Sequence, residues 1–350
     1  MTGPEPPTRK RIKLALQGGG AHGAFTWGVL DRLLGDPRLE VEGIVGTSAG
    51  AMNTALVADG LAAGGPDLAR RMLTEFWSGI GKMAAAAPVQ PTPMDRLSSP
   101  GTMRFSPLWM ATDAMFKLFS PYQLNPLNQN PLRQLLEDLV DFPRLRKAAR
   151  PAAFVCATNV LNGRLKVFAR HEMSAAAVMA SGCLPQLFQA VEVDGEHYWD
   201  GGYSGNPPIF PLIYMGGCPD IIIVQLNPIN VQLNPINIPA VPRDTRAIMD
   251  RINTLAFNSS LMREMRMIHF VTQLIDRGDL DGGKYLRLFI HCIDAEEQLA
   301  GLDPSSKLNA APDFLTHLFE LGVAQAEAFL TSHFDTIGVA SSTDIESKFC

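Results

Sequence analysis

Short apolar runs alternate with longer helix-like segments along most of the chain. Four apolar runs are typical of buried strands: 12–17, 41–45, 152–159 and 220–224. The last of these (DIIIV) has the unbroken apolar pattern expected in the middle of a parallel sheet. Apolar residues at helical spacing follow at 67–83, where Asp67 is the expected N-cap, and at 132–140, 174–181, 243–277 and 313–330. This alternation predicts an α/β fold with a mainly parallel central sheet.

Two hairpin signals and one later strand complete the predicted sheet. Asn162-Gly163 predicts a tight turn with a return strand at 164–168. Asp194-Gly195 predicts a second turn inside a hairpin at 191–198. A further strand is expected at 285–293, close to the C-terminal helix.

The segment at 84–150 interrupts the alternation, and we expect it to form a helical cap on a single α/β domain. Residues 84–101 are rich in Pro, Ala and Ser, so a loop is expected there. Residues 105–119 (FSPLWMATDAMFKLF) form a broad apolar helix-like stripe that either packs on the core or forms a lid or acyl-chain pocket. The expected organisation is a flexible leader at 1–11, one domain at 12–350 and, within it, a C-terminal helical extension at about 240–350.

Composition and charge argue against several classes of function. The 350 residues are 46% hydrophobic and carry a formal net charge of −5, so no nucleic-acid partner is expected. No apolar run reaches the roughly 18 residues that a membrane span needs, and no signal-peptide core follows the basic run at 9–13. We expect a soluble cytoplasmic protein with, at most, peripheral attachment to a lipid surface. The five cysteines lack CxxC spacing and are expected to be free and buried, and neither a metal nor a calcium requirement is indicated.

One sequence repeat occurs in the chain. The residues VQLNPIN at 224–230 recur immediately at 231–237. A unit this short cannot form a solenoid layer, and two copies are too few. We expect a local duplication that lengthens a turn-rich loop after the strand at 220–224.

Two glycine-rich turns near the N-terminus carry the strongest indication of chemistry. Each follows a predicted strand and opens a predicted helix: Gly18-Gly19-Gly20-Ala21-His22-Gly23 and Gly46-Thr47-Ser48-Ala49-Gly50. A right-handed crossover makes the two strands parallel, so both turns emerge at the same edge of the sheet. Ser48 would then stand on a sharp strand-to-helix turn beside a loop of bare backbone N–H groups. This is the arrangement of a nucleophile beside an oxyanion hole.

Each turn also has a simpler interpretation. Ser48 would only cap the following helix if its turn were an ordinary one. Gly18-x-Gly20-x-x-Gly23 also matches a dinucleotide-binding fingerprint, which would indicate an oxidoreductase. That fingerprint requires an acidic residue at the end of the second strand, whereas Glu40 and Glu42 lie at its start. The oxyanion interpretation therefore fits the loop better.

A serine nucleophile requires a base, and Asp200 is the candidate. It ends the second predicted hairpin and precedes Gly201-Gly202, a turn that lets the carboxylate approach another backbone segment closely. Burial would raise its pKa toward the working pH and make it an effective base; the alternative is an aspartate that only bonds within its own turn. The late histidines are expected to be ordinary, because His291 lies in a predicted strand and His317 and His333 lie on or just beyond a predicted helix.

These residues resemble the motifs of the patatin-like phospholipase family. The resemblance rests on the three motifs at 18–23, 46–50 and 200–202, with support from Ala180-Ser181-Gly182-Cys183-Leu184-Pro185. It implies a three-layer α/β/α sandwich and a Ser48–Asp200 dyad that hydrolyses fatty acyl esters of lipids through an acyl-enzyme, without a cofactor or a metal. It also implies an oxyanion hole built from the backbone of Gly18, Gly19, Gly20 and Ala21.

One position departs from the family pattern. His22 stands where the family usually has Arg or Lys, and a neutral histidine supplies less positive charge near an oxyanion or a phosphate headgroup. A preference for phospholipids over neutral esters is therefore open at this point. Transfer of the acyl group to another alcohol by the same dyad, and lipid binding without catalysis, are the alternative functions.

Overall fold

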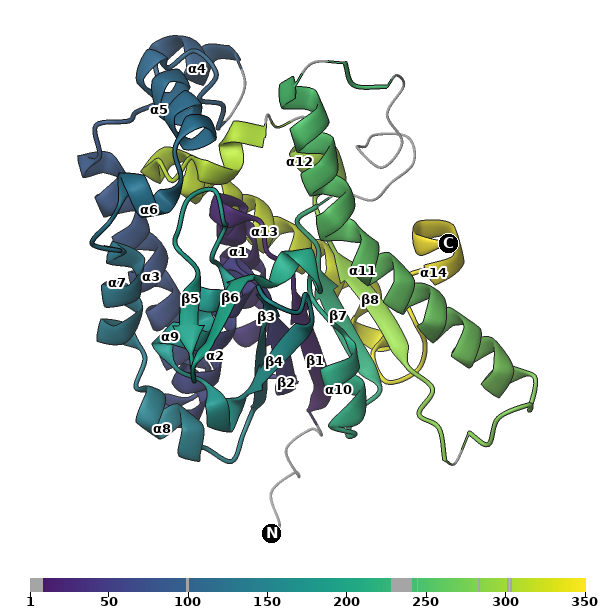
Figure 1. The fold of residues 1–350 in the computed structure, drawn as a ribbon. Coiled ribbons are helices and arrows are strands. Elements are labelled where there is room, and N and C mark those ends of the chain that lie inside the picture. The colour runs from purple at the N-terminus through teal and green to yellow at the C-terminus, as the bar shows by residue number, and fades with distance from the viewer. Residues whose placement is uncertain are drawn as a thin grey trace.

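A central sheet lies between two layers of helices (Figure 1). The computed structural model describes residues 9–98, 101–227, 241–243, 245–282, 284–300, 302 and 304–350. The strands are β1 (Lys10–Leu16), β2 (Leu39–Gly46), β3 (Ala152–Asn159), β4 (Leu165–Ala169), β5 (Val191–Val193), β6 (Glu196–Asp200), β7 (Asp220–Val224) and β8 (Phe289–Ile293). Their order is β5-β6-β3-β2-β1-β7-β8, with β4 paired to β3.

Parallel pairing dominates the middle of the sheet. β1 pairs in parallel with β2 and β7, β2 with β3, and β7 with β8, whereas the pairs made by β4, β5 and β6 are antiparallel. The predicted mainly parallel sheet and both predicted hairpins are thereby confirmed. Leu16 is the partner of Gly46, so β1 and β2 end side by side and the two glycine-rich turns do emerge at one edge.

Helices connect the strands, and most of them cover the two faces of the sheet. They are α1 (Gly23–Leu34), α2 (Ala49–Gly64), α3 (Pro66–Ala86), α4 (Pro93–Ser98), α5 (Pro107–Leu118), α6 (Pro121–Leu124), α7 (Pro131–Leu139), α8 (Phe142–Lys147), α9 (Ala175–Ser181), α10 (Phe210–Tyr214), α11 (Thr245–Asp276), α12 (Glu296–Ala300), α13 (Pro312–His333) and α14 (Ile345–Phe349). Short 3-10 turns are η1 (Gly20–His22), η2 (Arg170–Glu172), η3 (Gly201–Tyr203), η4 (Pro304–Leu308) and η5 (Phe334–Thr336).

Alternate side chains of the central strands enter two separate cores. Leu14 and Leu16 of β1 join the core that contains α1, α2, α3, α9 and α13. Ala15, between them, joins the core that contains α10, α11 and α14. Because both faces are covered, strands such as β7 are apolar without interruption, as the sequence predicts.

Helices α1 and α13 cross at unusually short range. A Cβ on Gly28 would lie 2.0 Å from the carbonyl oxygen of Phe319, and a Cβ on Gly322 would lie 2.1 Å from that of Phe25. The rings of Trp27 and Phe319 pack nearby, with centroids 4.1 Å apart. Glycine on both helices therefore lets the C-terminal helix dock onto the first one.

Several predicted boundaries are wrong for identifiable reasons. Helix α3 begins at Pro66 with Gly65 as its N-cap, so Asp67 lies in the first turn, because proline is favourable at the start of a helix. The loop expected at 84–101 contains α4. Strand β8 begins only at Phe289, because its partner β7 begins at Asp220 and the preceding residues have no strand to pair with.

Other expectations agree with the structure only in part. β1 begins at Lys10, before the expected end of the leader, and residues 1–8 lie outside the described chain. The second copy of VQLNPIN also lies outside the described residues, as does the end of the first copy. All five cysteines are free, but Cys292 is only partly buried and Cys350 is exposed. Helix α5, in the expected cap, has no buried residue, so it is not a core helix.

The α1–α13 crossing yields a stability prediction. We expect Gly322→Val to lower the free energy of unfolding by about 1–3 kcal/mol, because its side chain would meet the backbone of α1. Ala328→Val, at an exposed position of the same helix, is the matched control and should cost less than about 1 kcal/mol. Urea unfolding measures both, and equal losses would contradict the tight crossing.

Candidate active site

Ser48 lies at the turn between β2 and α2. Its backbone has φ 56° and ψ −122°, which residues other than glycine rarely adopt. The turn closes tightly, since a Cβ on Gly46 would lie 2.1 Å from the carbonyl oxygen of Gly50, and one on Gly50 would lie 2.3 Å from that of Leu16. Ser48 occupies the N-cap position of α2, but its side chain makes no capping hydrogen bond. Helix capping therefore does not explain the serine or its strained backbone.

Segments distant in sequence hold this turn in place. The Ser48 amide donates to Oγ of Ser181, at 2.9 Å. Ser181 ends α9 and belongs to the Ala180–Pro185 segment that the sequence singled out. Thr47 donates from Oγ1 to the carbonyl oxygen of Gly205, at 2.8 Å. The Ser48 backbone is thus fixed from two sides, and 8% of the residue's surface is exposed.

Asp200 ends β6 and is completely buried. Its Oδ1 accepts a hydrogen bond from the amide of Gly202, at 2.7 Å. Its Oδ2 is buried without a hydrogen-bond partner among the described residues. Both glycines after it are required, because a Cβ on Gly201 would lie 2.2 Å from the carbonyl oxygen of Cys156, and one on Gly202 would lie 2.3 Å from the ring of Phe257.

Burial controls the ionisation of this carboxyl group. Loss of solvation raises the pKa of Asp200 to about 7, and the Gly202 amide and the Ser48 hydroxyl offset only part of the increase. The Ser48 hydroxyl is therefore close enough to influence the carboxyl group, although it completes no hydrogen bond to Oδ2. A carboxylate with this pKa can accept a proton near neutral pH.

The glycine-rich loop lies directly against the serine. A Cβ on Gly18 would be 2.6 Å from Cβ of Ser48, and Gly20 has a φ of 60°, which favours glycine. The Gly18 amide already donates to Oδ1 of Asn206, at 2.7 Å. The Gly18 amide can hold an oxyanion only if its hydrogen bond to Asn206 breaks. The amides of Gly19 and Gly20, the next two residues of the loop, are the other candidates.

Three polar residues around this loop escaped the sequence analysis. Besides Asn206, Oε1 of Gln17 accepts from the amides of Leu226 and Asn227, at 2.8 and 2.9 Å. Nδ2 of Asn227 donates to the carbonyl oxygen of Gly18, at 3.0 Å. The available signal was position, because Gln17 directly precedes the glycines and Asn206 lies four residues after Gly202. Gln17 and Asn227 connect the glycine-rich loop to the segment after β7, and Asn206 connects it to the segment after η3.

His22 faces away from solvent and is neutral. It is 3% exposed, and its Nε2 is hydrogen-bonded to Oγ of Ser306, at 2.7 Å. Burial, assisted by the nearby charge of Lys307, lowers the pKa of His22 to about 3. His22 therefore brings no positive charge to the loop at neutral pH.

The described chain offers little support for other kinds of site. No group of three or more His, Cys, Asp or Glu side chains within it is placed to hold a metal ion. None of its helices is both long and apolar enough to cross a membrane. Among the late histidines, His291 is paired away from Ser48: its Nε2 is 3.1 Å from Oδ1 of Asp220, and its Nδ1 is 2.9 Å from Oγ of Ser342.

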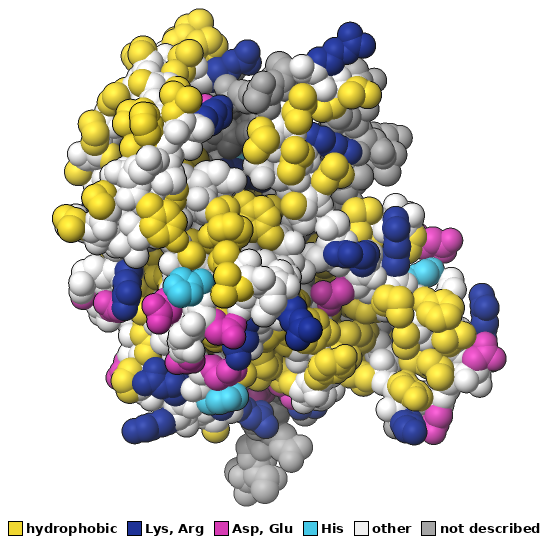
Figure 2. Space-filling view, viewed as in Figure 1, with side chains coloured by type: hydrophobic (Ala, Val, Ile, Leu, Met, Phe, Trp, Pro, Cys, Tyr) yellow, Lys and Arg dark blue, Asp and Glu magenta, His cyan; other side chains and the backbone are white. Residues whose placement is uncertain are grey.

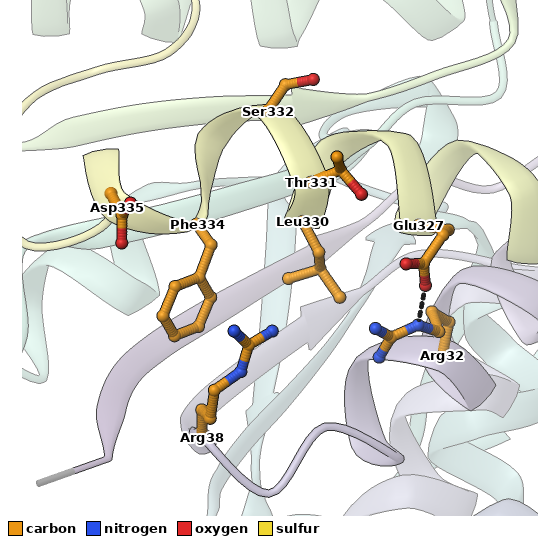
Figure 3. Close-up of a pocket in the computed structure, with 8 residues that line it drawn as sticks. All are labelled: Arg32, Arg38, Glu327, Leu330, Thr331, Ser332, Phe334 and Asp335. Carbon is orange, nitrogen blue, oxygen red and sulfur yellow. Dashed lines mark hydrogen bonds and ion pairs between the residues drawn. The ribbon is translucent and has the colours of Figure 1, made fainter. Parts of the chain in front are cut away.

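A polar cavity lies at the opposite edge of the sheet (Figure 3). It has a volume of about 300 Å³ and is lined by residues of α1, α13 and η5 and by Arg38, which lies just before β2. Arg32 forms an ion pair with Glu327 across it. Arg38 pairs with Asp36 at 2.7 Å, and its guanidinium lies over the ring of Phe334. Because these cations are neutralised within the fold, we assign no ligand to the cavity.

Comparison with known proteins adds a family assignment to this geometry. Residues 14–213 match the family model described as patatin-like phospholipase. A search of curated proteins found no match. Among solved structures, VipD from Legionella pneumophila is similar with 16% identity and a TM-score of 0.43, over 93% of this chain and 67% of that chain. ExoU in its complex with SpcU, from the type III secretion system of Pseudomonas aeruginosa, is similar with 15% identity and a TM-score of 0.31, over 93% and 78% of the two chains.

The buried carboxyl group predicts a pH-dependent effect on stability. The pKa of Asp200 in the folded chain, about 7, exceeds its ordinary value of 3.8, so ionisation penalises folding increasingly as the pH rises between these values. We expect Asp200→Asn to melt at a higher temperature than the wild type at about pH 8, and the gain to disappear near pH 4.

Asp279→Asn, at an exposed aspartate, is the matched control for this measurement. Its melting temperature should follow that of the wild type across the same pH range. A gain for Asp200→Asn that persists at low pH would contradict an origin in the buried charge.

Proposed function

Because this chain is an enzyme that belongs to the patatin-like phospholipase family, we propose that it hydrolyses fatty acyl esters of lipids with Ser48 as nucleophile and Asp200 as base. Phospholipids, lysophospholipids and other lipid esters are the substrate class. The observation that carries the proposal is the environment of the Asp200 carboxyl group. This group lies near the Ser48 hydroxyl, and its Oδ2 is buried without a hydrogen-bond partner among the described residues. Burial supplies the basicity that a serine nucleophile needs, without a histidine.

Acylation begins when the Asp200 carboxylate takes the proton of Ser48 Oγ as Oγ attacks the carbonyl carbon of the ester. The carbonyl π electrons move onto the oxygen, and the oxyanion is stabilised by backbone amides of the glycine-rich loop. Collapse of this tetrahedral intermediate breaks the bond to the alcohol. The alcohol leaves with the proton held by Asp200, and the acyl group is esterified to Ser48.

Deacylation repeats these steps with water. Asp200 takes a proton from the water molecule as its oxygen attacks the acyl carbonyl carbon. The second tetrahedral intermediate expels Ser48 Oγ, which recovers the proton from Asp200. The products are a free fatty acid and the unchanged enzyme, so one water is consumed per ester cleaved.

We assign the oxyanion to the amides of Gly19 and Gly20, with Ala21 as the next candidate. The Gly18 amide acts differently in this proposal, because its hydrogen bond to Asn206 holds the loop against Ser48. Gly20 supports the assignment through its left-handed backbone, which turns the loop sharply at this point. The following helix α1 adds the positive end of its dipole at the same place.

A lipid surface is the proposed setting of the reaction. α5 has no buried residue, and apolar side chains there and nearby are largely exposed: Leu97 (84%), Met110 (60%), Leu118 (77%) and Leu127 (78%). Figure 2 shows such side chains gathered over α4, α5 and α6, at the upper left. These helices stand at the edge of the sheet where the glycine-rich turns emerge (Figure 1). An apolar surface beside the site favours contact with an aggregated lipid over a dissolved ester.

The dyad is tested by labelling and turnover together. We expect a fluorophosphonate to label the wild type and not Ser48→Ala, and a medium-chain p-nitrophenyl ester to be hydrolysed. Asp200→Asn should lower kcat at least about 100-fold, because it removes the general base. Ser332→Ala, at an exposed serine of α13, is the control and should behave as the wild type. Full activity in Asp200→Asn would contradict the dyad, and tight lipid binding without labelling would favour the non-catalytic alternative.

The lipid-surface proposal is tested with the double variant Met110→Ser, Leu118→Ser. We expect hydrolysis of phospholipid vesicles to fall about tenfold or more, because each apolar side chain loses roughly 1.5–3 kcal/mol of transfer free energy. Hydrolysis of a soluble short-chain ester should stay unchanged. Tyr214→Ser, at an exposed position on α10 (83%), is the control. Equal losses on both substrates would indicate a structural role for the cap instead.

A further inference from the structure

A C-terminal turn outside the family match forms the outer wall of the glycine-rich loop. η4 lies at 304–308, whereas the family match ends at residue 213. A Cβ on Gly20 would lie 2.2 Å from the carbonyl oxygen of Lys307, so the two backbones are in contact. The adjacent Ser306 is hydrogen-bonded to His22, at 2.7 Å. The oxyanion loop is therefore completed by a segment that carries no motif in the sequence.

Lys307 connects its charge to this loop through one amide side chain. Its Nζ donates to Oδ1 of Asn227, at 2.7 Å. Nδ2 of the same Asn227 donates to the carbonyl oxygen of Gly18, at 3.0 Å. Gly18 is the residue that lies against Ser48. The ammonium group is thus separated from the loop backbone by a single amide, and its charge is close enough to lower the pKa of His22.

The positive charge of Lys307 is placed where it can stabilise negative charge at the loop. A negative charge develops on the substrate oxygen in both steps of the proposed reaction, and fixed positive charge nearby stabilises it most effectively where water is limited. His22, inside the glycine motif, is neutral at working pH because of its burial. Lys307 is half-buried and reaches the loop from η4, in the C-terminal part of the chain.

We propose that Lys307 is a positioning residue of the oxyanion loop, which holds Asn227 on Gly18 and supplies the positive charge that His22 does not. This inference rests on the proposed hydrolysis at Ser48. It assigns a role to the C-terminal segment, and it places the electrostatic support of the loop outside the glycine motif.

The test compares four variants with the wild type: Lys307→Met, Lys307→Gln, Lys307→Arg and the control Lys82→Met, at an exposed lysine of α3. For each we would measure kcat and KM with a neutral medium-chain ester, the rate of labelling by a fluorophosphonate, and the melting temperature. Gln keeps an N–H donor, one bond closer to the backbone than Nζ, but has no charge. It therefore tests the charge even if the Met variant does not fold.

We expect Lys307→Met and Lys307→Gln to lower kcat about tenfold or more with KM changed less than about twofold, since the lost stabilisation belongs to the transition state. Labelling should slow by a similar factor, because the phosphonyl oxygen would occupy the same hole. Lys307→Arg should recover most of the rate, and Lys82→Met should match the wild type.

Three outcomes would overturn the inference: wild-type kcat in folded Lys307→Gln, a loss confined to KM, or an equal loss of kcat in Lys307→Arg. These outcomes leave the dyad intact, because the wild type is active in each. A folded wild type that neither labels nor turns over would instead overturn the proposed function, and this inference with it.

Discussion

The close approach of two backbone turns at one edge of the sheet is the constraint on which the site depends. Parallel pairing sets Leu16 beside Gly46, so the loop after β1 and the turn after β2 leave the sheet together. Gly18 can lie against Ser48 only without a side chain, because its Cβ would be 2.6 Å from that of Ser48. The same contact sets the serine beside the amides proposed to hold the oxyanion. A larger residue at 18 would separate the two parts of the site.

The carboxyl group of Asp200 adds a second constraint, which is energetic. A buried carboxylate normally has several donors, yet Asp200 accepts one backbone hydrogen bond through Oδ1, and its Oδ2 has no partner in the described chain. Because the compensation is incomplete, burial raises the pKa of Asp200 to about 7. Unfavourable burial of this kind persists where the surrounding structure is well packed, and the contacts of Gly201 and Gly202 provide that packing here. In the proposed mechanism this costly burial makes the aspartate a base.

Local signals explain what the sequence predicted well. Neighbouring residues alone determine the glycine turns, the apolar strands and the Asn-Gly and Asp-Gly hairpins. The sequence pattern therefore identifies these features without knowledge of the fold. The start of β8 depends on where β7 begins, and the exposure of α5 depends on what lies beneath it. Neither can be deduced from the local sequence.

The contacts that support the glycine-rich loop could not be predicted from the sequence for the same reason. Asn206, Asn227 and Lys307 reach Gly18 or Gly20 from distant segments, and a single asparagine or lysine has no local pattern that reveals such a contact. The departure at His22 was visible, but its physical consequence was not. Only the fold brings Ser306 and Lys307 to that histidine, which buries it in the neutral form.

The most direct test of this account is an infrared titration of the Asp200 carboxyl group, taken as the difference between the wild type and Asp200→Asn. We expect a protonated carboxylic acid band in the wild type that disappears with an apparent pKa of about 7 and is absent from the variant. A band that titrates near the ordinary aspartate value of 3.8 would mean that the carboxyl group is solvated, and it would contradict a buried base acting on Ser48.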